Sequence, residues 1–177
     1  DTGTIKLASL LLDDKDDDGD NAEEKRSSSG GDGNNLRIKC SRVLTGHNHM
    51  VNALALDTER KCLYSGSADN SIIRWSLEEL SSESEEEESC MSCFLGHTGS
   101  VNALALLCVD QQHPDTSGRG RVQRLLLFSG ANDQTIRVWD AERGVCTGTL
   151  RAHQGAVLDL ALIGNYIHTH THTFRSQ

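Results

Sequence analysis

The sequence LTGHNHMVNALAL at residues 44–56 returns as FLGHTGSVNALAL at residues 94–106, and this repetition decides the fold. A weaker third copy, LRAHQGAVLDLAL, occupies residues 150–162. Between the copies, YSGSADNSIIRWS at 64–76 matches FSGANDQTIRVWD at 128–140. Repetition on this scale indicates a chain built from similar structural units that stack on one another.

The units have the composition of short strands, since apolar runs alternate with Gly, Ser, Asn and Asp. The first unit is predicted to hold four strands, at about 50–56, 61–66, 71–76 and 90–95. The second is predicted to hold strands at 101–107, 124–130, 135–140 and 145–150. The third offers one strand, at 157–162, and an additional strand at 36–44 precedes the first unit. The turns at 67–70 and 131–134 carry Asn and Asp, which suit the left-handed backbone of a two-residue hairpin loop.

The residues at fixed positions in the units resemble those of the WD-repeat β-propeller family. In the first unit they are Gly46-His47, Ser65, Asp69 and Trp75, and in the second Gly96-His97, Ser129, Asp133 and Trp139-Asp140. The resemblance covers about residues 36–165 and implies an all-β fold of four-stranded antiparallel blades. The sequence departs from the family pattern at Ser76, which follows Trp75 in place of Asp, and at Ala152, which precedes His153 in place of Gly. The third unit shows no matching Ser, Asp or Trp.

The repeated polar residues are expected to form one structural tetrad in each unit. An indole N–H only donates, a hydroxyl and a neutral imidazole both donate and accept, and a carboxylate only accepts. A chain of hydrogen bonds from Trp through Ser and His to Asp therefore satisfies every group. The expected tetrads are His47, Ser65, Asp69 and Trp75, and His97, Ser129, Asp133 and Trp139.

The same residue types also make up a Ser-His-Asp catalytic set. The set occurs twice at corresponding positions, whereas an enzyme needs one active site. The sequence therefore favours a non-enzymatic protein, with no catalytic residue and no cofactor.

Closed propellers have about 4–8 blades, and this chain supplies two and a fraction. We expect an incomplete ring, with blades at about 46–95 and 96–150 and a partial third at 151–165. The strand at 36–44 is expected to belong to a blade whose other strands lie elsewhere. The chain is interpreted as the N-terminal portion of a larger propeller, and assembly of several copies into a ring is the alternative.

The acidic residues lie mostly outside these units. The net charge is −9, of which residues 1–39 contribute −4 and residues 78–88 contribute −7, so the remainder carries +2. Residues 1–35 are expected to form a disordered acidic leader, since residues 13–35 contain no Leu, Ile, Val or Phe. The charge argues against direct nucleic-acid binding. No apolar run approaches the roughly 18 residues of a membrane span, and no secretory cleavage pattern is visible. The six cysteines are therefore expected to be reduced, in a cytoplasmic or nuclear protein.

One end of the propeller is the family's usual binding surface. By resemblance, its contact positions fall on Met50, Asn52, Ala68, Ser100, Asn102 and Asn132. None of the six is basic, so capture of phosphorylated peptides is disfavoured and an uncharged peptide or protein surface is favoured. The insertions 77–89 and 108–123 are expected to project from the opposite end. They are interpreted as tolerated surface loops or, alternatively, as elements that dock a partner.

Weaker patterns suggest modification or metal binding. Ser82 and Ser84 each precede an acid by three residues, which resembles the sites of acid-directed kinases. Residues 14–19 match the start of a calcium loop, but Lys25 stands where a Glu ligand is required. The alternating histidines of the low-complexity tail at 166–177 could chelate a divalent metal. No metal site is predicted from these patterns, nor from the lone pair Cys90 and Cys93.

The sequence thus predicts a non-enzymatic scaffold for protein–protein interaction, built from WD repeats. One alternative is a substrate-recruiting subunit of a ubiquitin ligase or a similar complex. An alternative of another class is a divalent-metal-binding protein that uses the Asp-rich segment or the histidine tail.

Overall fold

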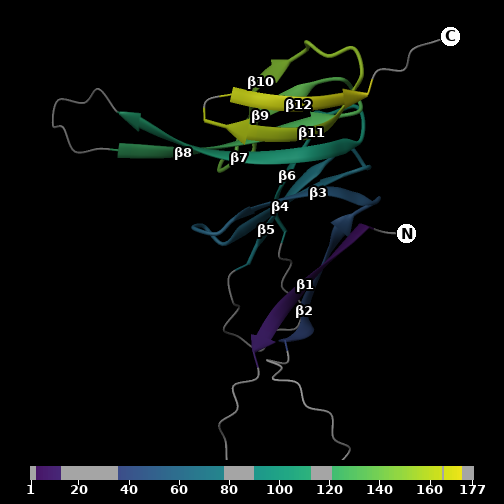
Figure 1. Cartoon of the computed structure of the whole chain (residues 1–177), viewed down its shortest axis with the longest axis vertical. Coiled ribbons are helices and arrows are strands. Elements are labelled where there is room, and N and C mark those ends of the chain that lie inside the picture. The colour runs from purple at the N-terminus through teal and green to yellow at the C-terminus, as the bar shows by residue number, and fades with distance from the viewer. Residues whose placement is uncertain (1–2, 13–35, 78–89, 113–120, 165, 173–177) are drawn as a thin grey trace, which may run out of the picture. The chain divides into compact units, whose positions relative to one another are not determined.

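The computed structural model of the chain describes residues 3–12, 36–77, 90–112, 121–164 and 166–172. Every regular element in this part of the chain is a β-strand, and the strands form antiparallel sheets (Figure 1). Within it, no helix is long and apolar enough to cross a membrane. The chain divides into two compact units, one made of Asp1–Thr4 with Leu44–Gln177 and the other of Ile5–Val43.

The first repeat forms a four-stranded meander. Its strands are β3 (Val51–Asp57), β4 (Cys62–Ser67), β5 (Ile72–Ser76) and β6 (Cys90–Phe94), in the order β3-β4-β5-β6. These bounds lie within one residue of the ranges that the sequence predicts. Every residue of β4 is buried, and this strand has a hydrogen-bonded neighbour on both edges.

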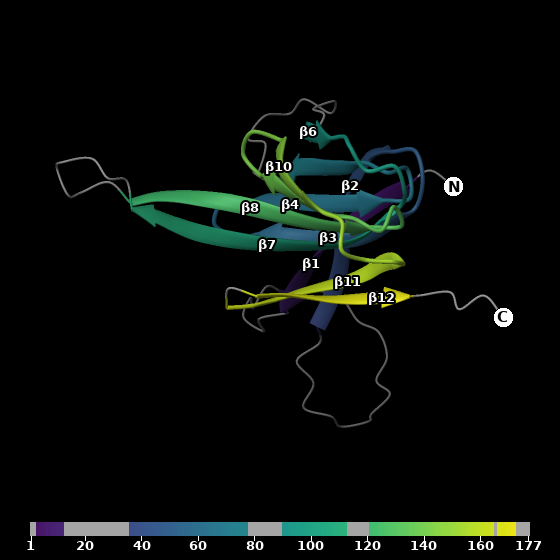
Figure 2. The ribbon, with the colours of Figure 1, turned by 90° about the horizontal axis from the view of Figure 1, so that it is seen from above.

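The second repeat forms an equivalent sheet in the order β10-β9-β8-β7, made of β7 (Val101–Gln112), β8 (Arg121–Ala131), β9 (Ile136–Asp140) and β10 (Val145–Leu150). β7 and β8 are longer than predicted and continue as a two-stranded arm beyond β9 (Figure 2). The pairs from Cys108 with Leu125 to Gln112 with Arg121 belong to this arm. Much of the predicted loop at 108–123 is therefore strand.

The third repeat contains two strands, β11 (Ala156–Ile163) and β12 (Tyr166–His172). The sequence predicts only the first, and treats residues 166–177 as a low-complexity tail. β12 forms because Ile167, Thr169 and Thr171 are β-branched and pair with residues of β11, and because Gly164 supplies a left-handed backbone (φ 57°) at the turn.

The N-terminal segment also differs from its prediction. Residues of the expected disordered leader form β1 (Gly3–Leu12), which pairs with β2 (Leu36–His47) in a two-stranded sheet. The apolar residues within GTIKLASLLL give this segment the composition of a strand, which the acidic average of residues 1–35 conceals. Residues 13–35 lie outside the described part of the chain.

The β4–β5 and β8–β9 loops contain three residues, rather than the predicted two. Asn70 N–H donates to the carbonyl of Ser67, and Ser67 N–H donates to that of Ser71. Asn70 adopts the left-handed conformation (φ 69°), and Gln134 does so in the second sheet (φ 66°). This is the three-residue hairpin in which a type I turn precedes one left-handed residue.

The hydrophobic core lies between consecutive sheets. One cluster joins residues of the first sheet to residues of the second: Cys62, Tyr64, Ile72 and Phe94 with Val101, Leu125, Leu127, Trp139 and Ala141. A second cluster joins the second sheet to the third: Ala103, Phe128 and Ile136 with Val157 and Leu160. Each sheet thus buries one face against the next.

A glycine lies at each of two points where one sheet packs closely against the next. A Cβ on Gly66 would lie 2.6 Å from Cγ1 of Val101, and one on Gly130 would lie 2.5 Å from Cγ1 of Val157. Both separations are too short for carbon atoms. The repeated glycine therefore allows β4 and β8 to contact the first strand of the following unit.

Candidate functional site

The four polar residues that repeat in the first unit meet in one hydrogen-bonded chain. Trp75 Nε1 donates to Ser65 Oγ at 2.7 Å, and Ser65 Oγ lies 2.7 Å from Nε2 of His47. The other imidazole nitrogen, Nδ1, lies 3.0 Å from Asp69 Oδ2. The residues come from β2, β4, β5 and the β4–β5 loop, so the chain fixes one end of the sheet.

The second unit repeats this arrangement. Trp139 Nε1 donates to Ser129 Oγ at 2.8 Å, Ser129 Oγ lies 2.7 Å from His97 Nε2, and His97 Nδ1 lies 2.8 Å from Asp133 Oδ2. The structure thus brings together all the members of both expected tetrads.

The direction of the hydrogen bonds follows from the groups at the two ends. Trp can only donate, so the serine hydroxyl accepts from it and donates its own proton to Nε2 of the histidine. The imidazole then carries its proton on Nδ1 and donates it to the carboxylate.

A hydroxyl two residues after each aspartate extends the tetrad beyond the residues expected from the sequence. Ser71 Oγ donates to Asp69 Oδ1 at 2.5 Å, and Thr135 Oγ1 donates to Asp133 Oδ1 at 2.6 Å. Their backbone N–H groups donate to the same oxygens, at 2.9 Å and 3.0 Å. The sequence does contain a signal for this contact, because a hydroxyl residue occupies the same position in both repeats.

These donors control the ionisation of the carboxyl groups. Burial alone would raise the pKa of Asp133, but hydrogen bonds from Thr135, Thr98 N–H and His97 outweigh it and lower the pKa to about 2. Asp69 behaves in the same way, with a pKa of about 2. Burial also lowers the pKa of His97, despite the opposing influence of Asp133.

The tetrads have the connectivity of a Ser-His-Asp catalytic set, but their serine hydroxyls are not accessible to a substrate. Ser65 and Ser129 are both 0% exposed, and each hydroxyl oxygen already accepts a hydrogen bond from an indole. A nucleophile must reach a substrate carbon. Neither serine can do so in this conformation.

The expected partner-contact residues lie near the tetrad end of the sheets, with differing exposure. Met50 is 57% exposed, Asn52 and Asn132 are exposed, and the other three positions are half-buried. Met50 and Ser100 also accept, through their carbonyls, the backbone N–H groups of Ala68 and Asn132, at 2.8 Å and 2.9 Å.

Two of these residues connect consecutive sheets. Asn52 Nδ2 donates to the carbonyl of Val101 at 3.2 Å, and Asn102 Nδ2 donates to that of Val157 at 3.0 Å. Asn102 also donates to Asn132 Oδ1 at 2.7 Å. Part of the amide hydrogen-bonding capacity at this end is thus used within the protein.

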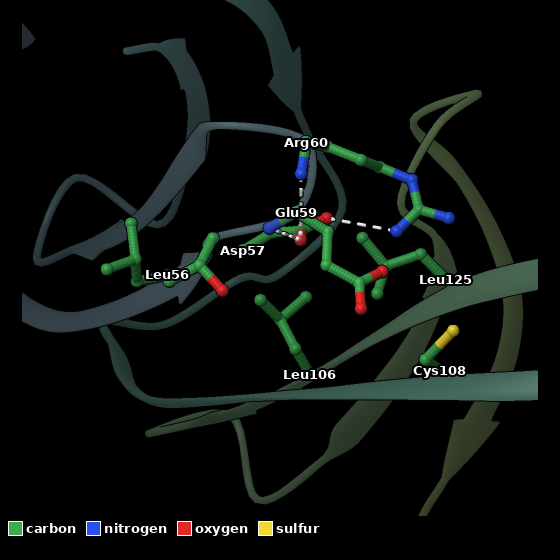
Figure 3. Close-up of a pocket in the computed structure, with 8 residues that line it drawn as sticks. Leu56, Asp57, Glu59, Arg60, Leu106, Cys108 and Leu125 are labelled. Carbon is green, nitrogen blue, oxygen red and sulfur yellow. Dashed lines mark hydrogen bonds and ion pairs between the residues drawn. The ribbon is translucent and has the colours of Figure 1, made fainter.

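A shallow hollow of about 220 Å³ lies at the opposite end, between the β3–β4 turn and the β7–β8 hairpin (Figure 3). It is lined by Leu56, Asp57, Thr58, Glu59, Arg60, Leu106, Cys108 and Leu125. Arg60 of this hollow pairs with Asp57 and with a residue of the neighbouring sheet. Arg60 bonds to Asp57 Oδ2 at 3.3 Å and to Glu142 Oε1 at 3.2 Å. This ion-pair network therefore also joins the sheet of the first repeat to that of the second.

These features match those of a known repeat family. The family model described as "WD domain, G-beta repeat" matches residues 38–76 and 88–140, which together make up more than half of the chain. The chain belongs to the WD40-repeat family. Its four-stranded sheets are propeller blades, and the all-β fold class with an incomplete ring is confirmed.

Curated WD40-repeat relatives include three proteins that match this chain with similar sequence identity. The CCR4-associated factor 4 homolog of Candida glabrata is 31% identical over 110 residues, which make up 61% of this chain and 16% of that protein. THO complex subunit 3 of Arabidopsis thaliana is 30% identical over 107 residues, 60% of this chain and 29% of that protein. Pre-mRNA-splicing factor PRP46 of Candida albicans is 33% identical over 107 residues, 59% of this chain and 22% of that protein. The chain spans less than a third of the length of each.

Solved structures support the same fold. The structure of U3-55K has a TM-score of 0.50 and 23% sequence identity, and it matches 70% of this chain and 32% of that one. The crystal structure of the RRP9 WD40 repeats also has a TM-score of 0.50 and 23% identity, covering 68% and 31%.

Several predicted features lie outside the described residues. They include Ser82 and Ser84, the Asp-rich segment at 14–19, and residues 173–177 of the tail. Among the described residues, no group of three or more His, Cys, Asp or Glu side chains is placed to hold a metal ion. The described thiols differ in exposure, since Cys62 is buried and Cys108 is exposed.

Proposed function

We propose that this chain supplies blades to a WD40 propeller that acts as a non-enzymatic scaffold for binding other proteins. The observation that carries the proposal is the use of the repeated Ser, His and Asp residues. They occur in two buried copies, each closed by an indole donor, which suits them to holding the blade rather than to chemistry. A fully satisfied buried network of this kind makes a rigid support for surface residues.

The proposed contact surface is the tetrad end of the blades, at Met50, Asn52, Ala68, Ser100, Asn102 and Asn132. Met50 contributes exposed apolar area, and Asn132 contributes an exposed amide. None of the six residues is charged. An uncharged peptide or protein segment therefore fits this surface better than a phosphorylated one.

The open face of the first blade supports completion of the ring by further blades. Leu104 and Leu106 of β7 pack against the first blade, whereas the equivalent Leu54 and Leu56 of β3 are 53% and 54% exposed. The covering blades would come from the rest of a longer chain or from self-association. None of the described features favours the ubiquitin-ligase or the metal-binding alternative.

The relatives suggest the setting in which such a scaffold works. One is named as a subunit of the THO complex and another as a pre-mRNA-splicing factor. By analogy, we place the whole protein within a multi-protein assembly in the nucleus or cytoplasm, with its contacts made to proteins rather than directly to nucleic acid.

Site-specific photocrosslinking tests the proposal. A photoreactive residue placed at Asn132 should crosslink one or a few proteins in a lysate of cells that express the chain. The matched control places it at Lys61, which is exposed at the opposite end. The proposal fails if both positions give the same products, or if a competing excess of the unlabelled chain leaves the Asn132 products unchanged.

A further inference from the structure

The sheet of the third unit has one face packed against the second sheet and one face turned away from it. Leu160 of β11 and Ile167 of β12 pack into the core between the two sheets. Because successive side chains of a strand point to opposite faces, Asp159, His168 and His170 lie on the other face. All three are exposed. These three residues define the outward face of the third unit.

The equivalent face of the first two sheets receives the next unit, and strand register identifies the matching positions. In each sheet, one cross-strand residue pair directly follows the register shift near the start of the first strand. These pairs are Ala53 with Gly66, Ala103 with Gly130, and Asp159 with His170. Two small residues of each complete blade are therefore replaced by a carboxylate and an imidazole in the third unit.

The glycine of this pair is a contact point for the following unit. Val101 packs on Gly66 so closely that a Cβ there would lie 2.6 Å from its Cγ1, and Val157 packs on Gly130 with a corresponding distance of 2.5 Å. His170 places both a Cβ and an imidazole ring at this point. A further unit that stacked in the same way would therefore overlap His170 with its first valine.

The side chain that bonds consecutive blades is also different in the third unit. Asn52 and Asn102 each donate to the carbonyl of the first valine in the following unit. Each asparagine directly follows a valine in the repeat, and Leu158 holds this position after Val157. A leucine side chain has no polar atom, so it cannot donate this bond to a unit stacked on the third.

The aromatic residue of the stacking face is replaced as well. Tyr64 and Phe128 lie buried between consecutive sheets, each opposite an alanine of its own sheet. His168 occupies the matching register position, opposite Ala161, and is exposed. Together with Asp159, it gives the third unit a polar face where the other two have an apolar one. Burying such groups without hydrogen-bond partners is unfavourable.

The first blade presents an exposed apolar surface at the other end of the stack. Leu54 and Leu56 of β3 are 53% and 54% exposed, whereas the equivalent Leu104 and Leu106 pack against the first blade. Complementary surfaces at the two ends of one chain would join copies head to tail, into rings or filaments. In other stacked repeat proteins, a terminal unit with a polar outer face keeps the stack soluble.

We propose that the outward face of the third unit caps the stack of blades and excludes the first blade of a second copy of this chain. The exposed leucines of β3 therefore do not drive head-to-tail assembly. This inference goes beyond the proposed function and narrows one part of it, since self-association cannot cover Leu54 and Leu56 with a third unit.

Converting the outward face into a stacking face tests this proposal on the full chain. An acceptor variant combines Leu158→Asn, Asp159→Ala, His168→Tyr and His170→Gly with Leu54→Asp, which disables its own β3 surface. In sedimentation velocity experiments, this variant should form a one-to-one complex with the unmodified chain. Restoring His170 in the acceptor variant is the matched control, and it should abolish the complex.

Photocrosslinking gives a second test that does not depend on the folding of the acceptor variant. A photoreactive residue in place of Ala161, opposite His168, should give no crosslink from the otherwise unmodified chain to β3 of an isotope-labelled second copy. Crosslinks to β3 of the second copy would overturn the proposal. So would an acceptor variant that melts cooperatively but forms no complex, or a complex that persists when His170 is restored.

Discussion

The side-chain amide of Asn102 donates to the backbone carbonyl of Val157, with 3.0 Å between the two atoms, and so bonds the second blade to the first strand of the third. The equivalent bond from Asn52 to Val101 measures 3.2 Å. Resemblance to the family assigned both asparagines to partner contact. The structure gives them an additional role, because each asparagine bonds its own blade to the first strand of the next.

Asn102→Ala should therefore reduce the free energy of unfolding by about 1 kcal/mol, the usual net contribution of one hydrogen bond. Urea denaturation measures the change. Asn48→Ala is the matched control, because that side chain is exposed, and it should alter stability by less than about 0.5 kcal/mol. Equal effects of the two substitutions would contradict the inter-blade role.

Thr135→Val should destabilise the second blade and raise the pKa of Asp133. The substitution keeps the side-chain shape but removes the hydroxyl that donates to Oδ1 at 2.6 Å. A hydrogen bond to a charged group contributes about 1.5–3 kcal/mol. Denaturant unfolding gives the stability, and NMR titration of the carboxyl carbon gives the pKa.

Thr135→Ser is the control for this prediction, because it retains the hydroxyl. It should leave the pKa of Asp133 near 2. A valine variant whose Asp133 titrates as in the unmodified chain would show that the hydroxyl does not stabilise the carboxylate.

Sequence repetition predicted the strands of the two complete blades because each carries the same short apolar runs between the same turn residues. It missed Ser71 and Thr135 because the four tetrad groups already satisfy one another without a further hydroxyl, although both repeats place one there. The asparagine bonds could not be predicted either. They depend on the separation of adjacent sheets, which no single repeat specifies.

The terminal strands were missed for a different reason. The average composition of the acidic N-terminal residues predicts disorder, and that of the His/Thr tail predicts a low-complexity segment. These averages conceal the short β-forming stretches that lie within both. β12 becomes recognisable only once its pairing with β11 places Thr169 beside His153. Strand pairing is a non-local property, so local composition is a weak guide to it.

Gly130→Ala should weaken the contact between the second and third units. The added Cβ would lie 2.5 Å from Val157 Cγ1, and relieving such overlap typically costs about 1–3 kcal/mol. Gly148→Ala is the control, since its Cβ would meet nothing closer than 3.8 Å. Thermal unfolding should separate the two variants clearly. Equal melting temperatures would mean that the blades do not pack this closely.

Stability should fall on acidification in two ranges. Burial lowers the pKa of His97 below its ordinary 6.5, so as the pH falls through this value the unfolded chain binds a proton that the folded chain still excludes. The free energy of unfolding therefore decreases as the pH falls below the ordinary pKa of histidine. Asp69 and Asp133 have pKa values of about 2, against 3.8 ordinarily, so their contribution is lost below about pH 4.

Melting temperatures measured from pH 7.5 to 2 check both ranges. His97→Gln should flatten the curve between pH 7.5 and 5 relative to the unmodified chain. Two curves that run parallel across that window would contradict the lowered pKa of His97.

The central claim is that the two Trp-Ser-His-Asp tetrads hold the blades. Comparing the free energies of unfolding of Ser65→Ala and Ser129→Ala tests it most directly. Each substitution leaves a buried indole N–H and a buried imidazole nitrogen without their shared partner, at about 1–3 kcal/mol for each unsatisfied group. The account predicts that both variants are destabilised to a similar extent. Full stability in either variant would contradict it, because that serine would then not be needed to hold its blade.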